Sequence, residues 1–163
     1  FKRLLLTVTG FTVAHSITLS LASLNIIRVR TELVELLIAL SILLLAVEII
    51  KHYRVKNYES FTWRYPITAS SVFGLLHGFG FAVVLQELGL PQSMKIHALL
   101  FFNIGVEIGQ IMFISGMAIL GYFVSKFLLK MSVKREMVVQ FAVYMIGISS
   151  AYWLFERSSA IFL

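Results

Sequence analysis

The chain has 163 residues, a formal net charge of +6 and a mean hydropathy of +0.90, and 59% of its residues are hydrophobic. A soluble domain of this size would have difficulty burying that much apolar surface, so the composition predicts that the bilayer is the solvent. The sequence contains no cysteine, which excludes disulfides, thiolate zinc sites and iron–sulfur clusters. It also contains no aspartate, so any carboxylate chemistry must use glutamate.

Five hydrophobic segments reach or approach the length of about 20 residues that spans a bilayer. They lie near residues 4–24, 33–50, 67–85, 98–122 and 137–156. We therefore predict an all-α fold, a polytopic transmembrane helix bundle that forms a single domain over residues 1–163, with about five spanning helices. Pro66 is expected to begin the third helix, where its missing N–H costs nothing.

The basic residues between these segments predict the orientation of the chain. With five spans, ten cations fall on one side and four on the other. The first side carries Lys2, Arg3, Lys51, Arg54, Lys56, Arg64, Lys126, Lys130, Lys134 and Arg135; the second carries Arg28, Arg30, Lys95 and Arg157. This asymmetry predicts that the N-terminus of the chain is cytoplasmic. No basic run is interleaved with polar recognition residues, so we expect the lipid bilayer as a partner and no nucleic acid.

Three ionisable side chains lie within the hydrophobic segments. His15 is near the middle of the first segment, His77 is near the middle of the third, and Glu107 is within the fourth. Such groups cost at least ~2.5–3.5 kcal/mol at membrane depth, so they usually pair, face a cavity or function. Because their depths agree, we expect the three to meet in the bundle centre. Imidazole and carboxylate ligands suit a divalent ion such as nickel, cobalt or zinc.

Further polar residues accompany the predicted metal ligands. Asn103 and Gln110 share one helical face with Glu107, because the three are spaced i, i+4 and i+7. Together with Ser16 and Thr18 they could orient the ligands. The alternative is a polar packing cluster in which a neutral histidine bonds to Ser or Thr and the glutamate is protonated or paired.

A second polar pair lies at the end of the second hydrophobic segment. Glu48 and His52 are spaced i, i+4 and could guide a cation toward the central site, or they could reach outward to interfacial water. The segment 51–66 mixes cations with tyrosine, phenylalanine and tryptophan, which is typical of a loop at headgroup level.

Two Gly-x-x-x-Gly pairs predict close helix contacts. Gly74 and Gly78 belong to the third segment, and Gly105 and Gly109 belong to the fourth. This spacing lets helix backbones approach each other. Since each pair is interleaved with a candidate site residue, we expect segments 67–85 and 98–122 to be neighbours.

Three stretches resemble the HupE/UreJ family of bacterial membrane proteins: FTVAHSITLSLASL (11–24), GLLHGFGFAVVL (74–85) and FNIGVEIGQ (102–110). The resemblance implies a nickel or cobalt permease, or an accessory protein of hydrogenase or urease. It carries His15, His77, Asn103, Glu107 and Gln110 over as site residues. It also implies an upstream helix with a Gly-x-Asp-His motif, which we expect either before Phe1 in a longer protein or lost from this copy.

Three functions follow from these patterns. The first is a divalent-metal permease or metal-delivery accessory protein, with nickel or cobalt as the favoured ion. The second is an intramembrane zinc-dependent hydrolase, in which two histidines and a glutamate leave one zinc position open for water. The third is a non-catalytic membrane subunit whose polar groups serve a second copy of the chain, a larger membrane complex, or a haem held by His15 and His77. We expect a transporter or accessory protein rather than an enzyme.

Overall fold

The computed structural model describes residues 2–87, 94–131 and 134–162. These residues form helices and connecting turns, with no strand among them. The helices are α1 (Lys2–Ser23), α2 (Thr31–Arg54), α3 (Phe61–Arg64), α4 (Pro66–Glu87), α5 (Lys95–Met131) and α6 (Arg135–Phe162). The all-α prediction is confirmed, and α4 begins at Pro66 as expected.

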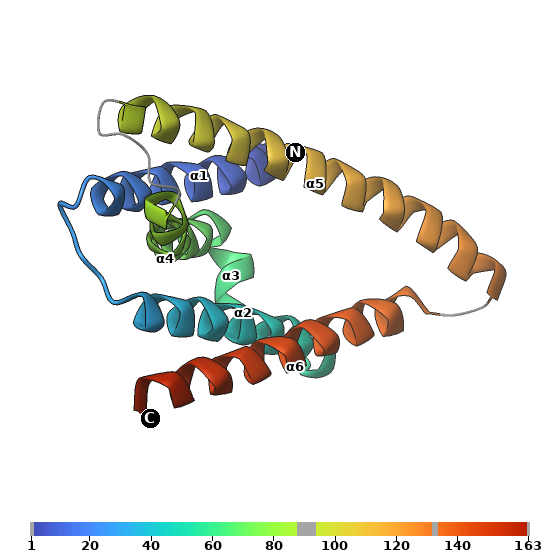
Figure 1. Cartoon of the computed structure of the whole chain (residues 1–163). Helices are drawn as coiled ribbons and strands as arrows, with labels where there is room; N and C mark the ends of the chain where they lie inside the picture. The colour runs from blue at the N-terminus through green and yellow to red at the C-terminus, as the bar shows by residue number, and fades with distance from the viewer. Residues whose placement is uncertain (1, 88–93, 132–133, 163) are drawn as a thin grey trace.

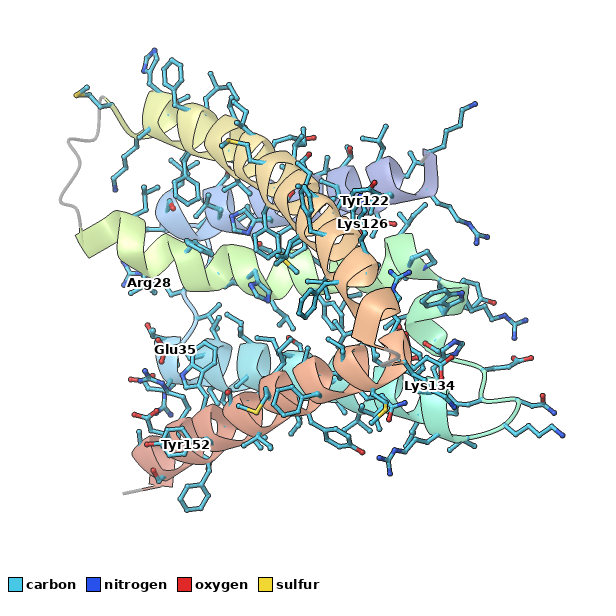
Figure 2. All side chains as sticks on the ribbon, turned by 90° about the vertical axis from the view of Figure 1, so that its right-hand side faces the viewer. Arg28, Glu35, Tyr122, Lys126, Lys134 and Tyr152 are labelled. Carbon is cyan, nitrogen blue, oxygen red and sulfur yellow. The ribbon has the colours of Figure 1, made fainter. Side chains whose placement is uncertain are left out.

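Five of the helices are long and apolar enough to cross a membrane. They coincide with the five predicted segments, and the chain is therefore a multi-pass membrane protein. The fifth helix, α5, has 37 residues and is about 55 Å long at ~1.5 Å per residue, well beyond a hydrocarbon core of about 30 Å. Figure 2 shows bulky side chains projecting from the helices in all directions, as expected where lipid replaces water as the solvent.

The helices form two groups on either side of α4. Helix α1 packs on α4 and α5, and helix α2 packs on α4 and α6. Figure 1 shows α1 and α5 together on one side of α4, with α2 and α6 together on the other. The order across the bundle is therefore α5, α1, α4, α2 and α6.

The closest helix pair is α1 with α4, and glycine makes it possible. A Cβ atom at Gly74 would collide with the backbone of Phe11, and one at Gly78 would collide with the His15 carbonyl oxygen and Thr18 Oγ1. Such approach allows extensive van der Waals contact, which is a main source of helix association in lipid.

Segments 67–85 and 98–122 touch through Phe81 and Phe102, whose ring centroids are 5.7 Å apart, but the glycines do not bring them together as predicted. Gly74 and Gly78 are used by α1, whereas Gly105 and Gly109 have no atom within 4 Å of an added Cβ. The spacing marks a smooth face, but it does not specify which helix will cover that face.

Candidate functional site

His15 lies where α1, α4 and α5 meet, and its side chain is 1% exposed. Its ring stacks against Phe11 of the same helix, with centroids 5.8 Å apart, and against Phe102 of α5 at 6.3 Å. Phe81 of α4 meets the imidazole edge-on at 5.5 Å. Three helices thus build an aromatic enclosure around one imidazole.

Neither nitrogen of His15 has a hydrogen-bond partner among the described residues. A buried polar group left unpaired costs about 1–3 kcal/mol, and protein interiors rarely contain one without a reason. Among the described residues, ring contacts therefore position the imidazole, and no protein group pairs with its nitrogens.

His77 lies next to this enclosure and is half-buried. Its ring is 5.6 Å from the ring of Phe11, which also stacks on His15. The two predicted imidazoles therefore lie at the same phenylalanine.

A polar seam joins α1 to α5 beside the aromatic enclosure. Ser16 Oγ lies 2.7 Å from Asn103 Oδ1, and Thr12 Oγ1 lies 3.0 Å from Gln110 Oε1. Asn103 Nδ2 also donates to the Leu99 carbonyl at 2.8 Å. Asn103 and Gln110, which were expected to share a face of the fourth segment, thus both bond to α1 and join the two helices.

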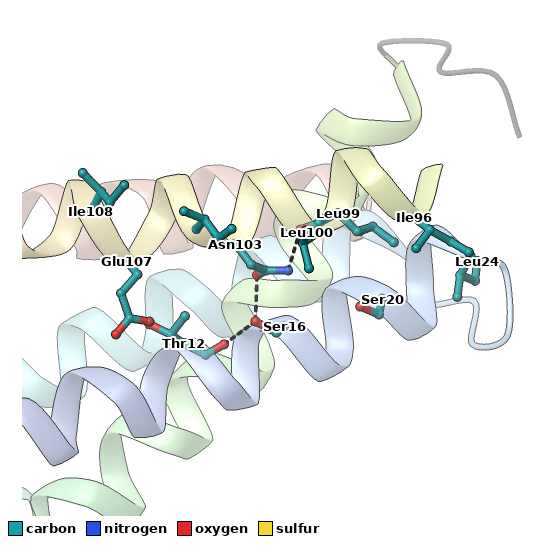
Figure 3. A pocket seen from close by; sticks show the side chains of 11 residues that line it. Thr12, Ser16, Ser20, Leu24, Ile96, Leu99, Leu100, Asn103, Glu107 and Ile108 are labelled. Carbon is teal, nitrogen blue, oxygen red and sulfur yellow. Dashed lines mark hydrogen bonds between the residues drawn. The ribbon is translucent and has the colours of Figure 1, made fainter. Parts of the chain in front are cut away.

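Glu107 lies in a groove of about 780 Å³ between the same two helices. Figure 3 shows its carboxylate pointing across the groove toward α1, near Thr12. The remaining wall is largely aliphatic, with Ser16 and Asn103 of the seam exposed to the same space. Within the described residues Glu107 has no hydrogen bond or ion pair, so its carboxylate is available to a ligand in the groove.

The donor types fit a divalent cation of the first transition row, since imidazole nitrogen and carboxylate oxygen are borderline and hard ligands. The described part of the chain, however, contains no group of three or more histidine or glutamate side chains close enough to hold one ion. The structure gathers His15 and His77 at Phe11, and it leaves Glu107 in the neighbouring groove.

Two of the other predicted residues have local structural contacts. Thr18 Oγ1 bonds back to the carbonyls of Ala14 and His15, at 3.3 and 3.2 Å. Glu48 Oε1 accepts from Ser60 Oγ at 2.6 Å and from the Thr62 amide at 3.0 Å. Glu48 therefore fixes the segment after α2. Its i, i+4 spacing to His52 did not predict this role.

Sequence reasoning missed the aromatic walls of the site. Phe11 precedes His15 by four residues and Phe81 follows His77 by four, so each shares a helical face with an imidazole. That spacing is a usable signal, but in a chain with 14 phenylalanines it also occurs by chance.

The HupE / UreJ protein family matches residues 1–157. No curated protein and no solved structure matches the chain.

Proposed function

This chain belongs to the HupE/UreJ family, and from that premise we propose that it carries divalent metal, nickel or cobalt, across or to the bacterial cytoplasmic membrane. It acts as a permease or as a metal-delivery accessory protein rather than as an enzyme. The metal is the cargo, and His15, His77 and Glu107 are its transient ligands. Residues 1–163 act as one helical domain with the N-terminus on the cytoplasmic side, where ten of the 14 Lys and Arg residues would lie.

The observation that carries the proposal is the unpaired imidazole of His15. A buried imidazole with two unused nitrogens, set within a spanning helix, is costly for a role in packing alone. It becomes useful if a cation that sheds part of its hydration shell needs replacement ligands at that depth. His77 at the same phenylalanine ring supplies a second nitrogen of the same type.

The separation of Glu107 from the two imidazoles supports transit rather than storage. Conduction requires binding that is favourable enough for entry and weak enough for release. A carboxylate in an open groove would attract a cation first, and the imidazoles would take it in a second step that brings α5 closer to α4. The seam residues Ser16, Asn103 and Gln110 would guide that movement, since they link α1 to α5 between the two parts of the site.

The direct test is uptake of radioactive nickel and cobalt by cells that express the chain from an inducible promoter. We expect His77→Phe and His15→Phe to lower uptake at least tenfold, because phenylalanine keeps the ring packing and removes the nitrogens. His97→Phe is the matched control, since His97 is an exposed histidine near the start of α5. Membrane levels of each variant are measured alongside.

Unchanged uptake in well-expressed His15→Phe and His77→Phe cells would overturn the proposal. Equal loss in all three variants would also count against it, because the effect would then be unrelated to the predicted site.

A further inference from the structure

A basic and aromatic surface lies between α2 and α4. Four exposed cations occur between Lys51 and Pro66 against one carboxylate. The cations are Lys51, Arg54, Lys56 and Arg64. The carboxylate, Glu59, is already paired with Arg64 at 3.0 Å. In the described residues no ion pair reaches the other three cations, so their charge is not neutralised within the protein.

Large aromatic side chains stand out from the same surface. Trp63 is 72% exposed, and Phe61 and Tyr65 on either side of it are exposed as well. One face of the indole is covered by His52, whose ring stacks 5.3 Å away at 13°. The exposed rings and the unpaired cations therefore belong to one surface, which we define as residues 51–66.

Two of the three unpaired cations lie over aromatic rings. Lys51 Nζ lies 5.9 Å from the Tyr58 ring centroid, and the Arg54 guanidinium lies 5.5 Å from that of Tyr144 on α6. Contacts of this type restrict long side chains without neutralising them. Their positive charge thus stays available to an anion.

Glu48 holds this segment in position through hydrogen bonds. Its carboxylate accepts from Ser60 Oγ and from the Thr62 amide, and Ser60 Oγ accepts in turn from the Trp63 amide at 3.2 Å. These bonds order α3, the four-residue helix that carries Phe61 and Trp63. A surface kept ordered in this way loses little conformational entropy when a ligand binds.

We propose that residues 51–66 bind the headgroups of anionic phospholipids. The segment joins two spanning helices, so it lies at the level where lipid phosphates are found and where tryptophan and tyrosine prefer to lie. The three unpaired cations match the charge of the phosphates, and the rings of Phe61 and Trp63 enter the boundary between headgroups and acyl chains. Juxtamembrane cations are attracted to anionic leaflets in this manner.

The two tryptophans of the chain make the proposal measurable. Trp63 belongs to the surface and Trp153 lies far along α6 from it, so each can report separately on its lipid neighbours. The full chain carrying Trp153→Phe is reconstituted into phosphatidylcholine vesicles that contain a minor fraction of phosphatidylglycerol. Either lipid is brominated near the headgroup end of its acyl chains, and Trp63 fluorescence quenching is compared at equal mole fractions.

We expect brominated phosphatidylglycerol to quench Trp63 severalfold more effectively than brominated phosphatidylcholine. Each cation near an anionic surface changes such a ratio by up to about fivefold, so Lys51→Gln with Lys56→Gln should remove most of the preference. Raising the ionic strength should also reduce it. The matched charge control is Arg28→Gln with Arg30→Gln at the other end of the helices, which should leave the preference unchanged.

A chain that carries Trp63→Phe and retains Trp153 should give equal quenching by the two lipids. Equal quenching of Trp63 itself would overturn the proposal and leave the cations available to an acidic soluble protein. A preference that survives the paired lysine substitution would equally overturn the assignment to this surface.

Discussion

The hydroxyl of Ser16 on α1 lies 2.7 Å from Asn103 Oδ1 on α5 and 2.6 Å from the carbonyl oxygen of Thr12. A hydroxyl has one hydrogen, so the two acceptors share it and the link to α5 competes with a bond inside α1. Helix α5 also contacts α1 through the His15 and Phe102 rings and through a buried apolar cluster that contains Leu19 and Leu99. The Ser16 link is therefore one of several polar and apolar contacts that hold α5 against the rest of the bundle.

The first prediction concerns this link. Ser16→Ala should lower the free energy of unfolding in detergent by about 0.6 kcal/mol and by no more than about 1.7, the range found for hydrogen bonds between membrane helices. Asn103→Ala should have a similar effect, and the double variant should lose less than the sum. Thermal unfolding of the four proteins gives the coupling energy.

Ser149→Ala is the control for the seam, because the one partner of the Ser149 hydroxyl in the described part of the chain is the Met145 carbonyl of its own helix, at 2.9 Å. If the losses of unfolding free energy in Ser16→Ala and Asn103→Ala add fully in the double variant, the contact between the two residues contributes no coupling energy between the helices.

The second prediction compares two glycines of identical spacing. Gly78→Ala should destabilise the chain by about 1–3 kcal/mol, as overpacking does, because the new methyl group would collide with the His15 carbonyl and Thr18 Oγ1. Gly109→Ala should be neutral, since nothing lies within 4 Å of its Cβ position. The measurement is the shift in apparent Tm in the same detergent, and equal shifts would contradict the assigned packing of α4 on α1.

The fold was largely predictable because segment length and apolar content are read directly from the residues. The five predicted segments follow from that rule, and the start of α4 at Pro66 follows from the tolerance of the first helical position for proline. The pairing of the helices was not predictable in the same way. Gly74 and Gly109 sit in equivalent motifs, yet only the first is covered, because complementarity depends on a second helix surface that the motif does not contain.

The residues of the candidate site could be proposed from the sequence, but the contacts between them could not. The rule that ionisable groups in a spanning helix are costly identifies His15, His77 and Glu107. It does not distinguish an imidazole enclosed by phenylalanines from a carboxylate in an open groove. That distinction depends on which way α1 and α5 are rotated, and each rotation follows from many weak contacts summed over the helix.

The third prediction concerns the carboxylate of Glu48. Glu48→Gln should speed amide hydrogen exchange at Thr62 and Trp63, because a neutral side chain is a weaker acceptor and hydrogen bonds to charged groups are the stronger ones. Exchange followed by mass spectrometry over residues 55–65 gives the rate. Glu59→Gln is the control, since Glu59 pairs with the exposed Arg64 and bonds to neither Thr62 nor Trp63 among the described residues. Protection at Thr62 should persist in that variant.

The fourth prediction concerns metal retention by the purified chain. After incubation with a mixture of nickel, cobalt, zinc and manganese and removal of the excess, elemental mass spectrometry should find metal below one equivalent, with nickel or cobalt enriched. A partial site with two imidazoles near one phenylalanine and a carboxylate in the neighbouring groove should retain metal only in part. His15→Phe should abolish retention, and Glu107→Gln should lower it, because an amide oxygen is a weaker ligand than a carboxylate.

Glu136→Gln, at an exposed glutamate where α6 begins, is the control and should leave metal retention unchanged. Retention by His15→Phe at the wild-type level would mean that metal binds elsewhere, and the unpaired imidazole would then need another explanation.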